Sequence, residues 1–220
     1  MALILNIDTA VETASVCLSN DAEMISLAVN DSQKDHAAWL HTAIRKLVQE
    51  SGHTVNDLQA VAISIGPGSY TGLRIGLSAA KGLCYALNIP LIAVGTLKMM
   101  AYAVNKEDAQ LICPLIDARR MEVFMAVYDK SLQEIMNPRA MIIDKNSFAD
   151  LLPSCKVIFC GNGRKKLQHI LSHTNALFSN SLATAANLPY LACKNFQEGK
   201  FSNLAYTEPL YIKEFYSPAR

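Results

Sequence analysis

The sequence predicts an α/β protein built from two similar halves, on three observations. Short apolar runs rich in β-branched residues alternate with segments of helical periodicity. Residues 60–87 read as a strand, a glycine-rich loop and a helix in direct succession. The order of β-hairpin, helix, strand, glycine turn and helix occurs twice along the chain, which favours a repeated α/β fold.

In the first half, three strands are predicted to form an antiparallel meander, over residues 3–7, 14–18 and 23–30. A helix is predicted over 36–51, because Leu40, Ile44 and Leu47 share one face and Gly52 follows as a C-cap residue. A buried strand at 60–65, a helix at 70–87, a short strand at 91–94 and a helix capped by Thr96 complete this half.

The junction between the halves is predicted near the charged stretch 106–108. The expected elements of the second half are a hairpin of strands 112–117 and 121–128, a strand at 139–143, a helix at 147–152, a strand at 157–160, and helices at 164–172 and 183–196. Pro189 must interrupt or begin the last helix. The tail from residue 201 contains two prolines and is expected to be irregular.

Composition indicates a protein with an ample core and little net charge. Of 220 residues, 51% are hydrophobic and 18% are charged, and the net charge is +1, so no strong attraction to nucleic acid or anionic lipid is expected. Six cysteines without C-x-x-C spacing are expected to be reduced thiols in a cytoplasmic protein. No apolar run approaches the roughly 18–20 residues of a membrane span, and no basic leader is present, so no membrane association is expected.

The segment GPGSYTGLRIG at 66–76 is the most informative stretch. It is not a Walker A loop, because no Lys follows Gly72, and the spacing of its glycines does not match the dinucleotide fingerprint. Spacing alone leaves two interpretations open for Gly66, Gly68 and Ser69, namely a plain tight turn or an anion-binding nest of backbone N–H groups.

Small residues also recur along the helix that follows the loop. Gly72, Gly76 and Ala80 are spaced four apart, and each glycine inside a helix costs about 0.8–1 kcal/mol relative to alanine. We expect such a smooth stripe where another backbone approaches closely. One side of the helix is then expected to face the sheet, and the other a second helix of this chain or another protein.

Acidic residues end the first strand of each half. Asp8 and Thr9 precede the first hairpin, and Asp117, Arg119 and Arg120 occupy the matching place in the second half. Each acid taken alone is most simply a turn residue. The symmetry of the two positions also fits a nucleotide-binding cleft between related lobes, in which an acid holds Mg²⁺ or a water.

Other candidate chemistry is weak. His36 and His41 are five residues apart, so they point about 140° apart on a helix, and no metal site is predicted. His169 and His173 are four apart but lack an acidic third ligand. No Ser-His-Asp or Cys-His set is identifiable, so no catalytic residue is predicted. The basic run 164–166 is interpreted as a solvated helix turn, with phosphate or RNA contact as the alternative.

Several motifs together resemble the TsaB (YeaZ) family, a subunit of the bacterial machinery that makes N6-threonylcarbamoyladenosine in tRNA. GPGSYTGLRIG is similar to the family's GPGSFTGLRIG, and DARRMEVF at 117–124 is similar to its DARRxEVY. IDTA at 7–10 and GNG at 161–163 resemble its IDTS and GDG elements. The resemblance implies the ASKHA fold of actin, Hsp70 and sugar kinases, with two RNase H-like lobes at 1–105 and 106–220. The tail of the second lobe can pack back on the first.

The resemblance also implies a role without catalysis. The family pairs with the TsaD threonylcarbamoyltransferase, and with the TsaE ATPase, to modify adenosine 37 of tRNAs that read codons starting with A. It implies a homodimer when the chain is alone, tRNA contact only through the complex, and no intrinsic cofactor. ATP or ADP with Mg²⁺ would bind at interfaces with partners. The alternatives are an ATP-dependent phosphotransferase of the same fold and a glycoprotease-like metallopeptidase.

Pairing in the family uses a helical bundle of the N-terminal lobe, which here implies the helices 36–51 and 70–87. The residues predicted to form the partner interface are Leu40, Ile44, Leu47, Gly72, Leu73, Gly76, Leu77 and Ala80. Departures from the family pattern are Tyr70 in place of Phe and Ala10 in place of Ser, and the latter removes a hydroxyl that could hold phosphate.

Overall fold

The structure is a computed structural model that describes residues 1–30 and 35–213. The chain forms two compact units, the first of Met1–Met99 with Ala183–Pro209 and the second of Met100–Leu182 with the described residues from Leu210 onward. The expected second lobe, 106–220, thus includes residues 183–209, which the structure places in the first unit. Residues 214–220 of that expected lobe lie outside the described residues.

The first unit contains a mixed five-stranded sheet. Its strands are β1 (Leu3–Asp8), β2 (Ala14–Asn20), β3 (Glu23–Asn30), β4 (Ala60–Ser64) and β5 (Leu91–Val94), in the order β3-β2-β1-β4-β5. The first three strands are antiparallel, and β4 and β5 run parallel to β1. The predicted meander is therefore present, followed by parallel strands that are reached through helices, because a parallel pair needs a crossover connection.

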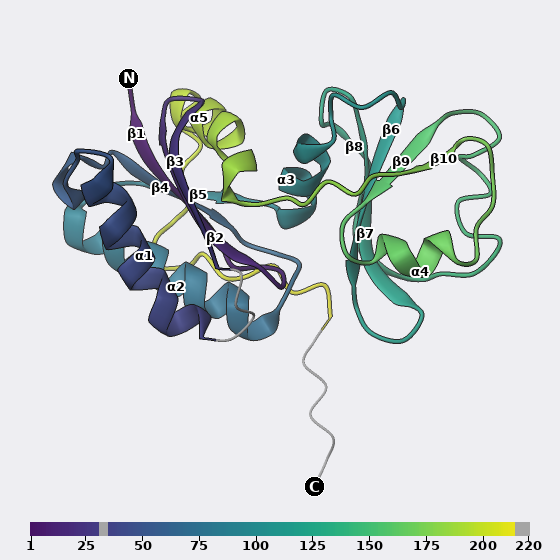
Figure 1. The fold of residues 1–220 in the computed structure, drawn as a ribbon, viewed down its shortest axis with the longest axis horizontal. Coiled ribbons are helices and arrows are strands. Elements are labelled where there is room, and N and C mark those ends of the chain that lie inside the picture. The colour runs from purple at the N-terminus through teal and green to yellow at the C-terminus, as the bar shows by residue number, and fades with distance from the viewer. Residues whose placement is uncertain (31–34, 214–220) are drawn as a thin grey trace, which may run out of the picture. The chain divides into compact units, whose positions relative to one another are not determined.

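Helices cover both faces of this sheet. Figure 1 shows α1 (His36–Glu50) and α2 (Tyr70–Leu87) side by side on one face and α5 (Pro189–Gln197) on the other. Leu5, Ile7 and Ile63 point toward α1 and α2 and form the centre of the core with their apolar stripes. On the opposite face, Ser15 Oγ accepts a hydrogen bond from Ala185 N–H in the short helix η2 (Ala185–Asn187), which precedes α5. The short helix η1 (Val55–Asp57) also belongs to this unit, and α3 (Thr96–Ala103) begins in this unit and ends in the second.

The second unit repeats the plan of the first. Its strands are β6 (Leu111–Asp117), β7 (Glu122–Asp129), β8 (Glu134–Ile142), β9 (Val157–Cys160) and β10 (Ala176–Phe178), in the order β10-β9-β6-β7-β8. Again the first three strands are antiparallel and the last two run parallel to the first. The predicted fold class, with two mixed five-stranded sheets of RNase H-like topology, is confirmed.

The second unit differs from expectation in its helices. Residues 147–152 form successive turns rather than a helix, because Phe148 has a left-handed φ of 66° and Ser147 Oγ accepts from Asp144 N–H. The helix predicted at 164–172 is shorter, as α4 covers Arg164–Gln168. Strand β10 was not predicted, since it is only three half-buried residues long.

The helix predicted at 183–196 is divided. Its first part is η2 (Ala185–Asn187), and Pro189 begins α5 at a position where the missing N–H is not needed. None of the helices in residues 1–30 and 35–213 is long and apolar enough to cross a membrane.

Candidate functional site

The C-terminal end of β1 places Asp8 in the interior of the first unit. Asp8 is fully buried, and its Oδ1 accepts hydrogen bonds from Ser64 Oγ at 2.5 Å and Ala10 N–H at 3.1 Å. Its Oδ2 has no hydrogen-bond partner among the described residues. Burial raises the pKa of Asp8 to about 6, although these hydrogen bonds lower it.

The glycines of the 66–76 segment pack against the chain just after β1. A Cβ at Gly68 would lie 2.2 Å from Ala10 O, one at Gly72 would lie 2.1 Å from Thr9 O, and one at Gly76 would lie 2.2 Å from Thr9 Oγ1. Thr9 Oγ1 donates a hydrogen bond to Gly72 O at 2.7 Å. The stripe of glycines therefore allows α2 to approach β1, inside the same unit.

Three backbone N–H groups of the 66–76 segment donate hydrogen bonds within the protein near its turn. Gly66 N–H donates to Thr96 Oγ1, Ser69 N–H donates to Ala10 O, and Gly72 N–H donates to Ser69 Oγ. Ser69 is the N-cap of α2. Of the two interpretations left open by the spacing, this geometry favours close packing over an anion-binding nest.

All eight residues predicted to form the partner interface lie in the interior of the first unit. The six with larger side chains are between 0% and 6% exposed, and Gly72 and Gly76 are buried against Thr9. These residues hold α1 and α2 on the sheet. An interface formed by the two helices would use their other faces, which corrects the residue-level expectation.

The outward faces of α1 and α2 form an apolar groove of about 550 Å³. Its lining residues are Ala37, His41, Arg74, Ile75, Ser78, Ala79, Gly82 and Leu83. A Cβ at Gly82 would meet no atom within 4 Å, so the floor of the groove is open at this point. The sequence also contained a pattern that could have indicated this groove, because Ser78 and Gly82 are two small residues four apart. The longer row of small residues at Gly72, Gly76 and Ala80 was interpreted as the interface instead.

In the second unit, the acid at the end of β6 is half-exposed and paired. Asp117 Oδ1 accepts hydrogen bonds from Lys166 Nζ at 2.5 Å and Arg119 N–H at 2.6 Å. Partial burial raises its pKa, but these hydrogen bonds and the charge of Lys166 outweigh burial and hold it below its usual value. Asn162 Oδ1 accepts a hydrogen bond from Asp117 N–H, so the GNG turn supports the same strand end.

The predicted cleft residues fall into two groups. Asp8, Thr9 and the loop residues Gly66, Gly68 and Ser69 are gathered in the first unit, and Asp117, Arg119 and Arg120 are gathered in the second. No group of three or more His, Cys, Asp or Glu side chains suited to a metal ion occurs in the described part of the chain.

Comparison with protein families decides the identity of the fold. Residues 29–218 match the family model described as "TsaD: tRNA N6-adenosine threonylcarbamoyltransferase". The chain is 30% identical over 224 aligned positions to the tRNA threonylcarbamoyladenosine biosynthesis protein TsaB of Escherichia coli, covering 96% of this chain and 94% of the relative. The chain belongs to the TsaB family.

Further relatives agree with the TsaB assignment. The Bacillus subtilis TsaB protein is 35% identical over 57% of this chain and 54% of its own length. The solved structure of YeaZ from Pseudomonas aeruginosa superposes with a TM-score of 0.84 at 25% identity, covering 96% of this chain and all of that one. The TsaB family takes part in the biosynthesis of threonylcarbamoyladenosine in tRNA.

Proposed function

We propose that this chain is a non-catalytic subunit that pairs with a TsaD-type threonylcarbamoyltransferase. Together with a TsaE-type ATPase, the pair would modify adenosine 37 of tRNAs that read codons starting with A. The observation that carries this proposal is the apolar groove between α1 and α2, because it lies on the two helices through which the resemblance implies pairing.

The groove has the properties of a helix-docking surface. Ala37, Ser78 and Gly82 leave room for a partner's backbone to approach, while Ile75 and Leu83 supply apolar surface beside them. Arg74 stands at its edge with its guanidinium 4.1 Å from the ring centre of Tyr70. Interhelical packing of this kind needs small residues at the contact and larger apolar ones around it.

The environment of Asp8 supports a role without catalysis. A general acid or base must reach a substrate proton, at roughly 2.6–3.2 Å or through one water. Asp8 is fully buried and held by Ser64 and Ala10, under a loop that packs directly on Thr9 and Ala10. The reacting groups would then come from the partner, and ATP or ADP with Mg²⁺ would bind where this chain meets its partners.

The groove can be closed by one substitution that should not disturb the fold. Gly82 is exposed on α2 with open space beyond it, and leucine has a higher helix propensity than glycine. We expect Gly82→Leu to keep or slightly raise the thermal midpoint and to weaken binding to the TsaD-type subunit at least about tenfold. The affinity would be measured by titration calorimetry with both purified proteins.

The matched control is Ala38→Leu. Ala38 is exposed on α1 but does not line the groove. The substitution therefore adds the same leucine side chain to the same pair of helices, but outside the groove. This variant should bind the partner as the unchanged chain does. Full affinity in Gly82→Leu would contradict pairing through this groove. In a reconstituted modification assay, product formed by the TsaD-type subunit without this chain would contradict its requirement.

The same groove is proposed for the homodimer formed when the partner is absent. Two copies facing each other would bury the groove of each and form an isologous contact. Gly82→Leu should therefore shift the chain toward monomer in light scattering, and Ala38→Leu should not.

A further inference from the structure

The turn between β6 and β7 carries two adjacent arginines in an unusual backbone conformation. Arg119 and Arg120 have φ values of 70° and 48°, both in the left-handed region. Glycine and asparagine are favoured there, because other side chains crowd the backbone. The turn is closed by hydrogen bonds from Ala118 N–H to Glu122 O and from Glu122 N–H to Arg119 O. Residues of this kind persist in strained turns where their side chains are needed.

The acidic groups around this turn are already neutralised. Lys166 of α4 reaches Asp117 Oδ1 at 2.5 Å and Glu122 O at 3.2 Å. Lys213 forms an ion pair with the Glu122 carboxylate at 2.6 Å. The two carboxylates and the two lysines thus form a cluster of ion pairs, which fixes the turn against α4.

Within residues 1–30 and 35–213, three cations of the turn and of α4 have side chains that form no hydrogen bond or ion pair. Arg119, Arg120 and Lys165, the neighbour of Lys166 on α4, are exposed, and their side chains form no hydrogen bond or ion pair with other described residues. The described residues of the second unit hold eleven Lys and Arg against eight Asp and Glu. The surplus of positive charge in this unit is thus presented in part at the turn.

We propose that Arg119, Arg120 and Lys165 form a phosphate-binding surface that contacts the backbone of the tRNA. This inference deepens the proposed function, since it rests on tRNA as the substrate of the complex. One guanidinium group can bind two phosphate oxygens at once through parallel hydrogen bonds. Because the turn is fixed, the two arginines are held next to each other before a phosphate binds, which lowers the entropic cost of binding. Contacts of this kind add affinity and orientation without reading the sequence.

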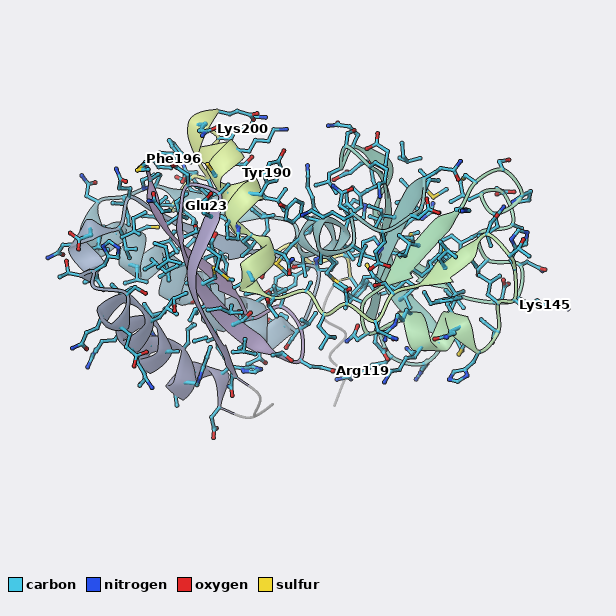
Figure 2. The ribbon with its side chains drawn as sticks, turned by 45° about the horizontal axis from the view of Figure 1, so that its top comes forward. Glu23, Arg119, Lys145, Tyr190, Phe196 and Lys200 are labelled. Atoms are coloured by element: carbon cyan, nitrogen blue, oxygen red, sulfur yellow. The ribbon has the colours of Figure 1, made fainter. Side chains whose placement is uncertain are left out.

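The variant that tests the surface is the double substitution Arg119→Asn with Arg120→Gly. It removes two charges and installs residues that suit the left-handed conformation, so the thermal midpoint should stay the same or rise. The control is Lys106→Asn with Lys145→Asn, which removes two exposed charges elsewhere in the same unit. Figure 2 shows Lys145 at the far side of this unit from Arg119.

Binding would be measured with an unmodified tRNA transcript, using the full chain alone and the complex with the TsaD-type subunit, over a series of salt concentrations. We expect the Arg119/Arg120 variant to bind about tenfold more weakly at 0.1 M salt. The slope of log affinity against log salt should fall by about 1.5, which corresponds to two lost phosphate contacts. The control should bind like the unchanged chain.

The outcomes separate this inference from the proposed function. If only pairing is wrong, Gly82→Leu will leave assembly intact while Arg119→Asn with Arg120→Gly still weakens tRNA binding. Unchanged tRNA affinity and salt slope in the arginine variant would overturn the surface, whether or not the complex assembles. Loss of TsaE-type or TsaD-type binding with normal tRNA binding would make it a protein contact instead. Displacement of the tRNA by Mg-ATP at equal phosphate concentration would assign it to a nucleotide, and also overturn it.

Discussion

The two units share one sheet topology but treat the end of their first strand in opposite ways. In the first unit, Asp8 is fully buried beneath the glycine loop, and burial raises its pKa to about 6. In the second, Asp117 follows the equivalent strand, is half-exposed and pairs with Lys166, and its pKa is held below the usual value in spite of partial burial. The same position in the fold is thus a sealed acid in one unit and a solvated ion pair in the other.

The glycine turns of the two units serve the same purpose. A Cβ at Gly68 would lie 2.2 Å from Ala10 O, and a Cβ at Gly161 would lie 2.4 Å from Leu115 O. In both units, the turn after the fourth strand therefore lies directly on the first strand or on the chain that follows it. The repeated glycines allow this close approach in both units.

The difference between the units lies in the helix that follows each turn. The first unit continues into α2 with 18 residues, and the second into α4 with five. The long helix covers the strand end and presents an apolar outward face, whereas the short one leaves the strand end and its charges in solvent. One unit therefore suits helix packing with a partner, and the other suits contact with a charged ligand.

The largest expected effect tests whether the first unit depends on close approach of α2. Gly72→Ala would place a methyl group 2.1 Å from the backbone oxygen of Thr9, which cannot move without displacing the end of β1. We expect it to lower the free energy of unfolding by about 3 kcal/mol or more, measured by urea denaturation.

Gly82→Ala is the control for this substitution, because it makes the same change on the same helix in open space. It should raise the free energy of unfolding by about 0.5–1 kcal/mol through helix propensity alone. Equal effects at the two positions would show that the glycines of α2 do not differ in their packing.

The second prediction concerns the sealed acid. A pKa raised from 3.8 to about 6 means that the folded state favours the protonated form of Asp8. Its stabilising contribution is fully present below about pH 4 and is lost as pH rises through about 6. Asp8→Asn stays neutral and keeps an acceptor for Ser64, so we expect it to be more stable than the unchanged chain by about 3 kcal/mol at pH 8 and about equal at pH 4.

Urea midpoints measured from pH 4 to pH 8 would check this. The unchanged chain should lose stability relative to Asp8→Asn mainly between about pH 4 and pH 6, so that the difference between the two curves grows over this range and levels off above about pH 6. A constant difference at all pH values would indicate that Asp8 is ionised throughout and that Ser64 and Ala10 stabilise its charge fully.

Sequence patterns were sufficient for the fold because each half repeats strong local signals. The apolar strands 3–7 and 14–18 and the helix 70–87 correspond closely to β1, β2 and α2. The patterns failed where the local sequence does not determine the backbone conformation. At Phe148, for example, the backbone is left-handed, and successive turns replace the expected helix. They also misassigned the glycine stripe, because spacing shows that Gly72 and Gly76 share a face but not whether that face meets β1 or a partner. Ser78 and Gly82 have the same spacing and face the groove, and only the packed structure separates the two stripes.

The smallest expected effect on stability is that of replacing Asp117, the exposed acid of the second unit. Its sign is opposite to that of Asp8→Asn, because the substitution should destabilise the fold. Asp117 contributes stability at neutral pH that is lost as pH falls through its lowered pKa, since protonation breaks its pairing with Lys166 and Arg119 N–H. Asp117→Asn should lower the free energy of unfolding at pH 7 by less than about 1 kcal/mol, because the pair is partly exposed and screened by solvent. At 0.5 M salt the loss should shrink further, whereas the effect of Asp8→Asn should stay, because Asp8 is fully buried. Denaturation of both variants at two salt concentrations would measure this contrast, and a stabilising Asp117→Asn would show that the two strand ends do not differ in their electrostatics.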